Sequence, residues 1–289
     1  MSPRLASTTV PAAFVVMWAT GFVVARSVAP FAEPMSFLTA RFAAASVLLG
    51  IYAGITGAAW PAGAEGWRNA LVAGILLHGL SLGGVFWSIA HGLPAGVSAL
   101  IAATQPLLTA LVARPLLGEA VPPLRWLGIL LGFAGVALVL APRMGGLDAY
   151  PPATVAVGFA SVAAFTLGTI WQKRTGSTGD LRAGMSIQFG AAAAITLAAA
   201  LLTETGQVDL TPQLVLAFVW TVLVLSIGAT LLLLVMLRRS AVVGVAVLLF
   251  LVPPLSALMG YAMFGETLQP LQLAGLALAT LGVGLAGRA

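Results

Sequence analysis

Residues 118–136 read GEAVPPLRWLGILLGFAGV, and residues 265–283 read GETLQPLQLAGLALATLGV. A Gly-Glu pair, a Pro-Leu pair, a lone Gly and a Gly-Val pair recur in the same order, each 147 positions apart (265 − 118 and 282 − 135). One constant offset through two apolar stretches indicates a duplicated chain. We place the first half at residues 11–141 and the second at residues 151–286.

The composition around this repeat is that of a membrane protein. Of 289 residues, 60% are hydrophobic and only 7% are charged, whereas soluble domains carry about a quarter charged residues. So few charges cannot cover a water-facing surface, which excludes a soluble globular protein. A disordered chain is also excluded, because disorder requires low hydrophobicity. The net charge of +5 comes from scattered basic residues, so we expect no nucleic-acid partner. Because the chain has no cysteine, disulfides, thiol nucleophiles and thiolate metal sites are excluded.

A membrane-spanning helix needs about 20 apolar residues, and the chain has room for ten. Apolar runs bounded by Pro, Gly or charge predict spans at Val10–Val28, Met35–Thr56, Ala70–Ala90, Ala95–Ala113, Leu124–Leu140, Val155–Trp171, Ala183–Leu202, Leu214–Leu237, Val242–Phe264 and Leu271–Leu285. Each half holds five spans, and because five is odd, the second half enters the membrane inverted. We therefore predict an all-α polytopic membrane protein with ten transmembrane helices in two inverted-topology five-helix repeats, an arrangement typical of secondary transporters.

Basic residues divide unevenly between the two sides that ten spans define. One side carries Arg4, Arg68, Arg114, Arg125, Lys173, Arg174, Arg182, Arg238, Arg239 and Arg288, and the other carries only Arg26 and Arg143 near span ends. Cytoplasmic loops are enriched in Lys and Arg. We therefore expect a multi-pass protein of a bacterial-type inner (plasma) membrane with both termini in the cytoplasm.

Short motifs in several spans resemble one family of carriers. They are Met17-Trp18-Ala19-Thr20-Gly21-Phe22, Ala40-Arg41-Phe42, Gln105-Pro106-Leu107-Leu108, Leu117-Gly118-Glu119, Pro253-Pro254-Leu255 and Phe264-Gly265-Glu266. In order and spacing they resemble the ten-span EamA-type members of the drug/metabolite transporter (DMT) superfamily, over essentially the whole chain. The resemblance implies export or exchange of small metabolites, including amino acids. The chain also looks compatible with the branch that exports aromatic and other amino acids.

Polar side chains inside apolar helices are rare and informative. With 100° per residue, three helices each place such residues on one face. The first face carries His78, Ser81 and Ser88, the second carries Ser98, Gln105 and Thr109, and the third carries Ser161 and Gln172 with the apolar Phe165 between them. They predict a hydrated substrate cavity between the three helices. The alternative is hydrogen bonding that holds helices together. Ser98 and Gln105 correspond to Val245 and Val252 at the repeat offset, so one wall would be polar and the other apolar.

Arg41 lies about seven residues into the second span, roughly 10 Å from its outer end. A guanidinium at that depth must pair, face water or reach the interface. Arg41 could bind a substrate carboxylate, pair with Glu33, or extend to the membrane surface. Trp18 and Phe165 are candidate walls of an apolar pocket, and Gln188 is a weaker pathway candidate.

Prolines and glycines mark the moving and the fixed parts of the predicted bundle. Pro106, Pro253 and Pro254 interrupt their helices and are candidate hinges of alternating access, or static kinks. Spans five and ten carry small residues at a spacing that permits close packing, so we interpret them as scaffold or dimer surface. Glu119 and Glu266 are expected to bind loop backbone or to cap the next helix.

The chain offers few groups for ion coupling or catalysis. All eight acidic residues lie in loops or at span edges, which leaves His78 as the one titratable candidate inside the spans. We predict a facilitative exporter that is not an enzyme, works by alternating access and has no cofactor or metal. The expected partners are a small-molecule substrate and the lipid bilayer, and we expect a monomer or weak homodimer. The alternatives are a proton-coupled antiporter and, with less support, a membrane-embedded lipid-modifying enzyme or a channel.

Overall fold

The computed structural model describes residues 3–28, 30–141, 150–176, 179–264 and 269–288. Within these ranges the chain is helical apart from its connections, and an isolated bridge between Ala32 and Val208 is its sole β-type pairing. Eight helices are long and apolar enough to cross a membrane, and Thr9–Gly21 and Pro270–Ala286 form two shorter apolar segments. The predicted ten-helix, all-α membrane fold is confirmed.

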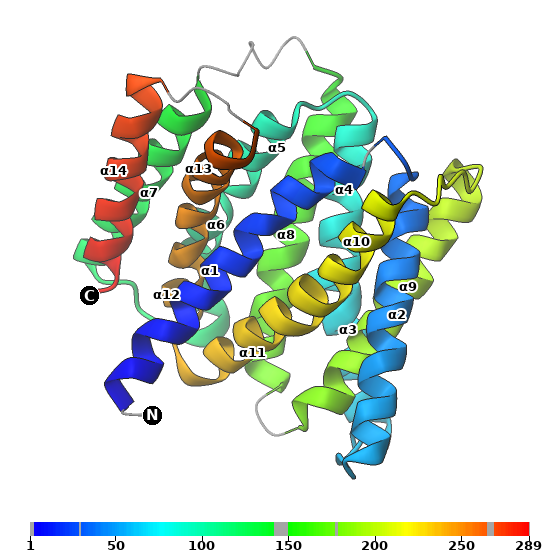
Figure 1. Cartoon of the computed structure of the whole chain (residues 1–289). Coiled ribbons are helices and arrows are strands. Elements are labelled where there is room, and N and C mark those ends of the chain that lie inside the picture. The colour runs from blue at the N-terminus through cyan, green and yellow to red at the C-terminus, as the bar shows by residue number, and fades with distance from the viewer. Residues whose placement is uncertain (1–2, 29, 142–149, 177–178, 265–268, 289) are drawn as a thin grey trace.

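Ten consecutive helical rods make up the described chain, and several are built from more than one element (Figure 1). The rods of the first half are α1 (Pro3–Val28), α2 (Pro34–Ile55), α3–η1–α4 (Gly63–Gly74, Ile75–Leu80, Ser81–Ala90), α5–α6 (Ala95–Ala102, Gln105–Leu117) and α7 (Pro123–Leu140). Those of the second half are α8 (Pro152–Thr175), α9 (Leu181–Thr203), α10–η4–α11 (Pro212–Trp220, Thr221–Ala229, Thr230–Arg239), α12–η5–α13 (Val242–Val247, Leu248–Leu251, Val252–Phe264) and α14 (Pro270–Ala286).

Local sequence explains where these rods begin and end. The helices α2, α7, α8, α10 and α14 each begin with a proline, which is favourable at the first helical position because its missing N–H would have no partner there. The helix α6 ends at Leu117 and is followed by Gly118, whose φ of 71° is left-handed, a conformation that glycine readily adopts after a helix.

The two halves meet through pairs of corresponding helices. Among the described elements, α7 packs most extensively on α14, and α2 packs next most extensively on α9. Figure 1 shows these two pairs at opposite edges of the bundle. Another pair of contacts follows the same correspondence, since α1 packs on α13 and its counterpart α8 packs on α6. The packing is that of two related halves around a pseudo-two-fold axis.

Irregular helical segments also recur at the repeat offset. The π-helix η1 (Ile75–Leu80) corresponds to residues 222–227, which lie inside the π-helix η4 (Thr221–Ala229). The break between α5 and α6 at residues 103–104 corresponds to residues 250–251, at the end of the 3₁₀ turn η5 (Leu248–Leu251). The face assignments made for His78 and Gln105 assumed unbroken α-helices, and that assumption is wrong for both rods.

The candidate hinge prolines lie directly after these irregular turns. Pro106 is the second residue of α6, and Pro253 and Pro254 are the second and third residues of α13. In the first turn of a helix the missing N–H of proline leaves no broken bond. The interruption in each rod is therefore the turn before the prolines, while the prolines start the next helix.

Candidate functional site

Arg41 is deeply buried on α2, with 7% of its surface exposed. Its Nε donates to Ser226 Oγ on η4 at 2.8 Å, and its guanidinium carbon lies 5.6 Å from the Phe42 ring centre. No ion pair of Arg41 with an acidic group is found among the residues that the structure describes. A buried cation without an opposite charge is unfavourable unless something else compensates it, so Arg41 is a strong candidate to bind an anion.

Two of the alternatives considered for Arg41 are wrong. Its burial rules out an extension to the membrane surface. Glu33, the other expected partner, instead accepts hydrogen bonds from the backbone N–H groups of residues 205–207 at 3.1, 2.6 and 2.9 Å. The loop before α10 therefore takes up the Glu33 carboxylate and leaves Arg41 without it.

His78 lies on η1 and packs between aromatic rings. Its ring centre is 4.5 Å from that of Phe189 and 6.2 Å from that of Phe42, and the residue is 2% exposed. The Phe42 ring that lies beside His78 also lies beside the Arg41 guanidinium. Its Nε2 finds no hydrogen-bond partner among the described residues, which is unusual for a buried nitrogen.

Gln188 lies on α9 and was only a weaker candidate from the sequence. Its Nε2 donates to Oε1 of Gln172 on α8 at 3.0 Å, whereas its own Oε1 has no partner within the described chain. The signal that could have found it is the repeat, because Gln188 is 147 positions after Arg41 (188 − 41). Arg41 and Gln188 thus occupy corresponding places in the two halves.

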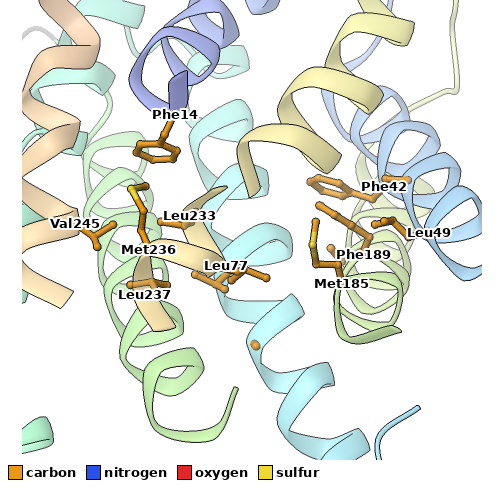
Figure 2. Packing of buried hydrophobic residues seen from close by; sticks show 14 of the residues in the cluster. Phe14, Phe42, Leu49, Leu77, Met185, Phe189, Leu233, Met236, Leu237 and Val245 are labelled. Atoms are coloured by element: carbon orange, nitrogen blue, oxygen red, sulfur yellow. The ribbon is translucent and has the colours of Figure 1, made fainter. Parts of the chain in front are cut away.

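The neighbouring phenylalanines mark where the halves meet. Phe42 and Phe189 also correspond at the repeat offset (189 − 42), and their rings stack with centroids 5.9 Å apart and an interplanar angle of 22°. Figure 2 shows the two rings side by side, with Leu49 and Met185 beside them. A contact between corresponding residues lies at the pseudo-two-fold axis. We name the group Arg41, His78, Gln172, Gln188 and Ser226 the axial site.

A second polar group lies at a small cavity between α6, α8, α11 and α12. Gln105 Nε2 donates to Thr109 Oγ1 at 2.8 Å, and Gln105 Oε1 has no partner in the described ranges. The cavity is lined by Gln105, Phe165, Thr169, Leu233, Leu237, Val242, Val245, Ala246 and Leu249. It has room for about one water molecule, so a metabolite can enter only if the helices move. Gln105 of the first half and Val245 of the second both line this cavity, and the larger substrate cavity stays a prediction.

The remaining candidate residues are buried, and they differ in whether their side chains have a hydrogen-bond partner. Ser81 Oγ donates to Leu77 O and Ser161 Oγ to Val157 O, both within their own helices. These serines are satisfied without a ligand and bind no second helix. Ser88 is fully buried with no partner found in the described chain, and Ser98 is also buried.

Two of the predicted apolar wall residues do lie together. The Trp18 ring centre is 6.0 Å from that of Phe165, and Phe165 also lines the small cavity. A face of α1 therefore reaches the region between the halves. The side chains of Trp18 and Phe165 can border a substrate there.

Carboxylates fasten the helix ends around these sites. Glu204 accepts from Met35 N, Ser36 N and Ser36 Oγ at 2.6, 2.7 and 2.8 Å, and so caps the start of α2. Backbone donors, Thr205 N–H foremost, hold the pKa of Glu33 below its usual range, because they stabilise the ionised carboxylate.

The expectations for Glu119 and Glu266 have different outcomes. Glu119 accepts from Val242 N at 3.0 Å, so it binds the first residue of α12 in the other half. It caps a helix far along the chain, not α7, which follows it. Glu266 lies outside the described residues. No cluster of three or more metal-ligating side chains occurs in the described ranges.

Comparison with known proteins gives the chain its family. The profile of the EamA-like transporter family matches residues 10–141 and again residues 153–288. The chain is 29% identical over 182 residues to the uncharacterized transporter YvbV of Bacillus subtilis, covering 62% of this chain and 57% of that protein. It is 26% identical over 190 residues to the uncharacterized inner membrane transporter YedA of Escherichia coli K12, covering 66% and 60%.

Length and fold complete the comparison. The matched region spans about three fifths of each of these relatives. A solved crystal structure aligns over 97% of both chains with a TM-score of 0.81 and 21% identity, which establishes the shared fold. The chain belongs to the EamA-like transporter family of the DMT superfamily and is a multi-pass membrane protein.

Proposed function

We propose that this EamA-family transporter exports small amphipathic metabolites, with amino acids as the leading class, by alternating access without obligatory ion coupling. The observation that supports it most is the pairing of irregular segments. The π-helices η1 and η4 and the breaks at residues 103–104 and in η5 occupy corresponding places in both halves. Interrupted helices at a repeat interface are typical of transporter binding sites.

The paired irregularities suit a rocking mechanism. The π-helices carry His78 and Ser226, both members of the axial site. π-helical turns are frequent at functional sites, and a change in either one would shift the axial site and its helix together. Corresponding changes in the two halves would open the site first to one side and then to the other.

Counterflow in proteoliposomes tests the transport proposal. Vesicles holding purified full-length chain are loaded with unlabelled amino acids and diluted into a labelled one. A carrier accumulates label transiently because exchange is faster than net flux. A pore or an enzyme gives no stimulation by unlabelled substrate, and that result across the amino-acid panel would contradict the proposal.

Proton-coupled antiport remains the second candidate, and one observation favours it. His78 is a buried titratable side chain at the repeat interface, in contact with both Phe42 and Phe189. If it carried protons, an imposed pH gradient would drive uphill uptake in wild-type vesicles and the uptake would vanish in His78→Ala. Facilitative transport predicts that the gradient changes only the rate and drives no accumulation.

A further inference from the structure

The axial site combines one cation with open hydrogen-bonding capacity. Arg41 uses its Nε on Ser226, which leaves the terminal nitrogens of its fork without a charged partner among the described residues. His78 Nε2 and Gln188 Oε1 are buried polar atoms that also lack partners there. Buried polar groups are normally satisfied, so two unpartnered polar atoms near a cation that has no acidic partner indicate a missing ligand.

The repeat explains how these groups come together. Arg41 reaches from α2 of the first half to η4 of the second. Its counterpart Gln188 lies on α9, which packs on η1 of the first half, the segment that carries His78. The helices that carry Arg41 and Gln188 therefore each pack on the π-helix of the opposite half. At the corresponding positions of Arg41 and Gln188, only the first half supplies a cation. The site as a whole holds a single positive charge.

We infer that the axial site binds one carboxylate of the transported molecule, and that the substrates are small monocarboxylates with an apolar body. This inference rests on the proposed transport function. An arginine fork matches the two oxygens of a carboxylate. A phosphate monoester carries about −1.5 to −2 at neutral pH, more than one guanidinium neutralises. The rings of Phe42, Phe189 and His78 supply the apolar surface.

The test uses five probes with one aromatic body: 3-phenylpropionate, L-phenylalanine, L-phenylalaninamide, phenethylamine and phenyl phosphate. Binding to the purified full-length chain is measured by calorimetric titration. The two carboxylates should bind at least tenfold more tightly than the amide, the amine and the phosphate. Equal or tighter binding of any carboxylate-free probe, or no binding of either carboxylate at millimolar concentration, would overturn the inference.

Variants at the two corresponding positions sharpen the test. Arg41→Gln should remove the preference for carboxylates, Arg41→Lys should keep part of it, and Arg174→Gln, at an exposed arginine, should leave it unchanged. The exchange Arg41→Gln with Gln188→Arg moves the cation to the other half and should restore some of the preference. A full carboxylate preference in Arg41→Gln would contradict the assignment.

Stability separates binding from a structural role. Because a buried, uncompensated cation is unfavourable, ligand-free Arg41→Gln should unfold at the same temperature as the wild type or higher. A large loss of stability with equal weakening for all five probes would show that Arg41 only holds the fold. Counterflow of a carboxylate-free compound alone would overturn this inference and leave transport standing. Carboxylate binding without counterflow would support this inference and contradict the transport proposal.

Discussion

Two pairs of corresponding helices join the halves of this EamA-family protein, and they are built in opposite ways. The α7–α14 pair meets through glycine and alanine, with backbone against backbone. The α2–α9 pair meets through Phe42, Phe189 and hydroxyl groups, and it carries Arg41 and Gln188 on its flanks. The same symmetry has produced a close-packed interface at α7–α14 and a more polar interface at α2–α9.

The small-residue faces of α7 and α14 are covered by each other. A Cβ on Gly128 would lie 2.6 Å from Gly282 O, and one on Gly275 would lie 2.6 Å from Gly135 O. Close approach of this kind is how small residues hold membrane helices together. The scaffold role fits this geometry, since the small-residue faces of the two helices are occupied within the chain.

The largest effect is expected from Gly135→Val in the close-packed pair. A Cβ there would lie 2.7 Å from Gly275 O and against the Ala279 backbone, so the helices must separate. We expect a loss of about 3 kcal/mol in stability and a strongly lowered apparent unfolding temperature in detergent. Gly284→Val is the control, because nothing lies within 4 Å of that position. Equal behaviour of the two variants would break the comparison.

A smaller effect is expected where α2 is fastened to the chain after α9. Glu204→Ala removes three hydrogen bonds to Met35 and Ser36 at the start of α2, and loss of a helix cap costs about 0.5 to 2 kcal/mol. The apparent unfolding temperature should fall by less than for Gly135→Val. Glu65→Ala is the matched control, because its exposed pairing with Arg68 at 3.8 Å contributes little. A Glu204→Ala protein as stable as Glu65→Ala would contradict the capping role.

The polar contacts inside the α2–α9 pair should contribute less again. Ser46 Oγ donates to Ser186 O at 2.8 Å, and Ser186 Oγ donates to Ser46 O at 2.9 Å. Interhelical hydrogen bonds in membrane proteins average about 0.6 kcal/mol. Ser46→Ala with Ser186→Ala should therefore lower stability by about 1 kcal/mol in unfolding measurements. Thr280→Ala, which loses an exposed bond within its own helix, should change it less, and a reversed order would show that the pair is not held this way.

Most of the helical framework could be predicted from sequence, because hydropathy and the spacing of small residues are local patterns. The ten spans, the duplication and the packing role of α7 and α14 all follow from patterns within one or two helices. Prolines such as Pro123 and Pro270 also give helix starts to within a residue. These features need no knowledge of which distant segments meet.

The axial site was only partly predictable, because it depends on tertiary contacts. Arg41 and His78 stand out as rare polar groups in apolar helices, but the π-helix η1 changes the face that His78 occupies. The pairing of Arg41 with Glu33 was wrong, since the backbone of residues 205–207 binds that carboxylate. Applying the 147-residue offset to Arg41 would have identified Gln188. By contrast, nothing in the sequence indicates that Ser226 receives the Arg41 hydrogen bond.

The smallest expected effect is the pH dependence of the loop contact beside α2 and α9. Backbone donors, Thr205 N–H foremost, lower the pKa of Glu33 from its ordinary value of 4.5, so the folded state favours the ionised carboxylate more than the unfolded chain does. The contribution to stability is then complete above the ordinary pKa and is lost as pH falls through the lowered value. The unfolding temperatures of wild type and Glu33→Gln should differ most near pH 7 and converge as pH falls below about 4.5. The exposed Glu65→Gln should show no such convergence. A wild-type advantage that stays constant from pH 7 to pH 3 would mean that the Glu33 charge does not hold this loop, and the α2–α9 pair would then be fastened at that end by Glu204 and not by Glu33.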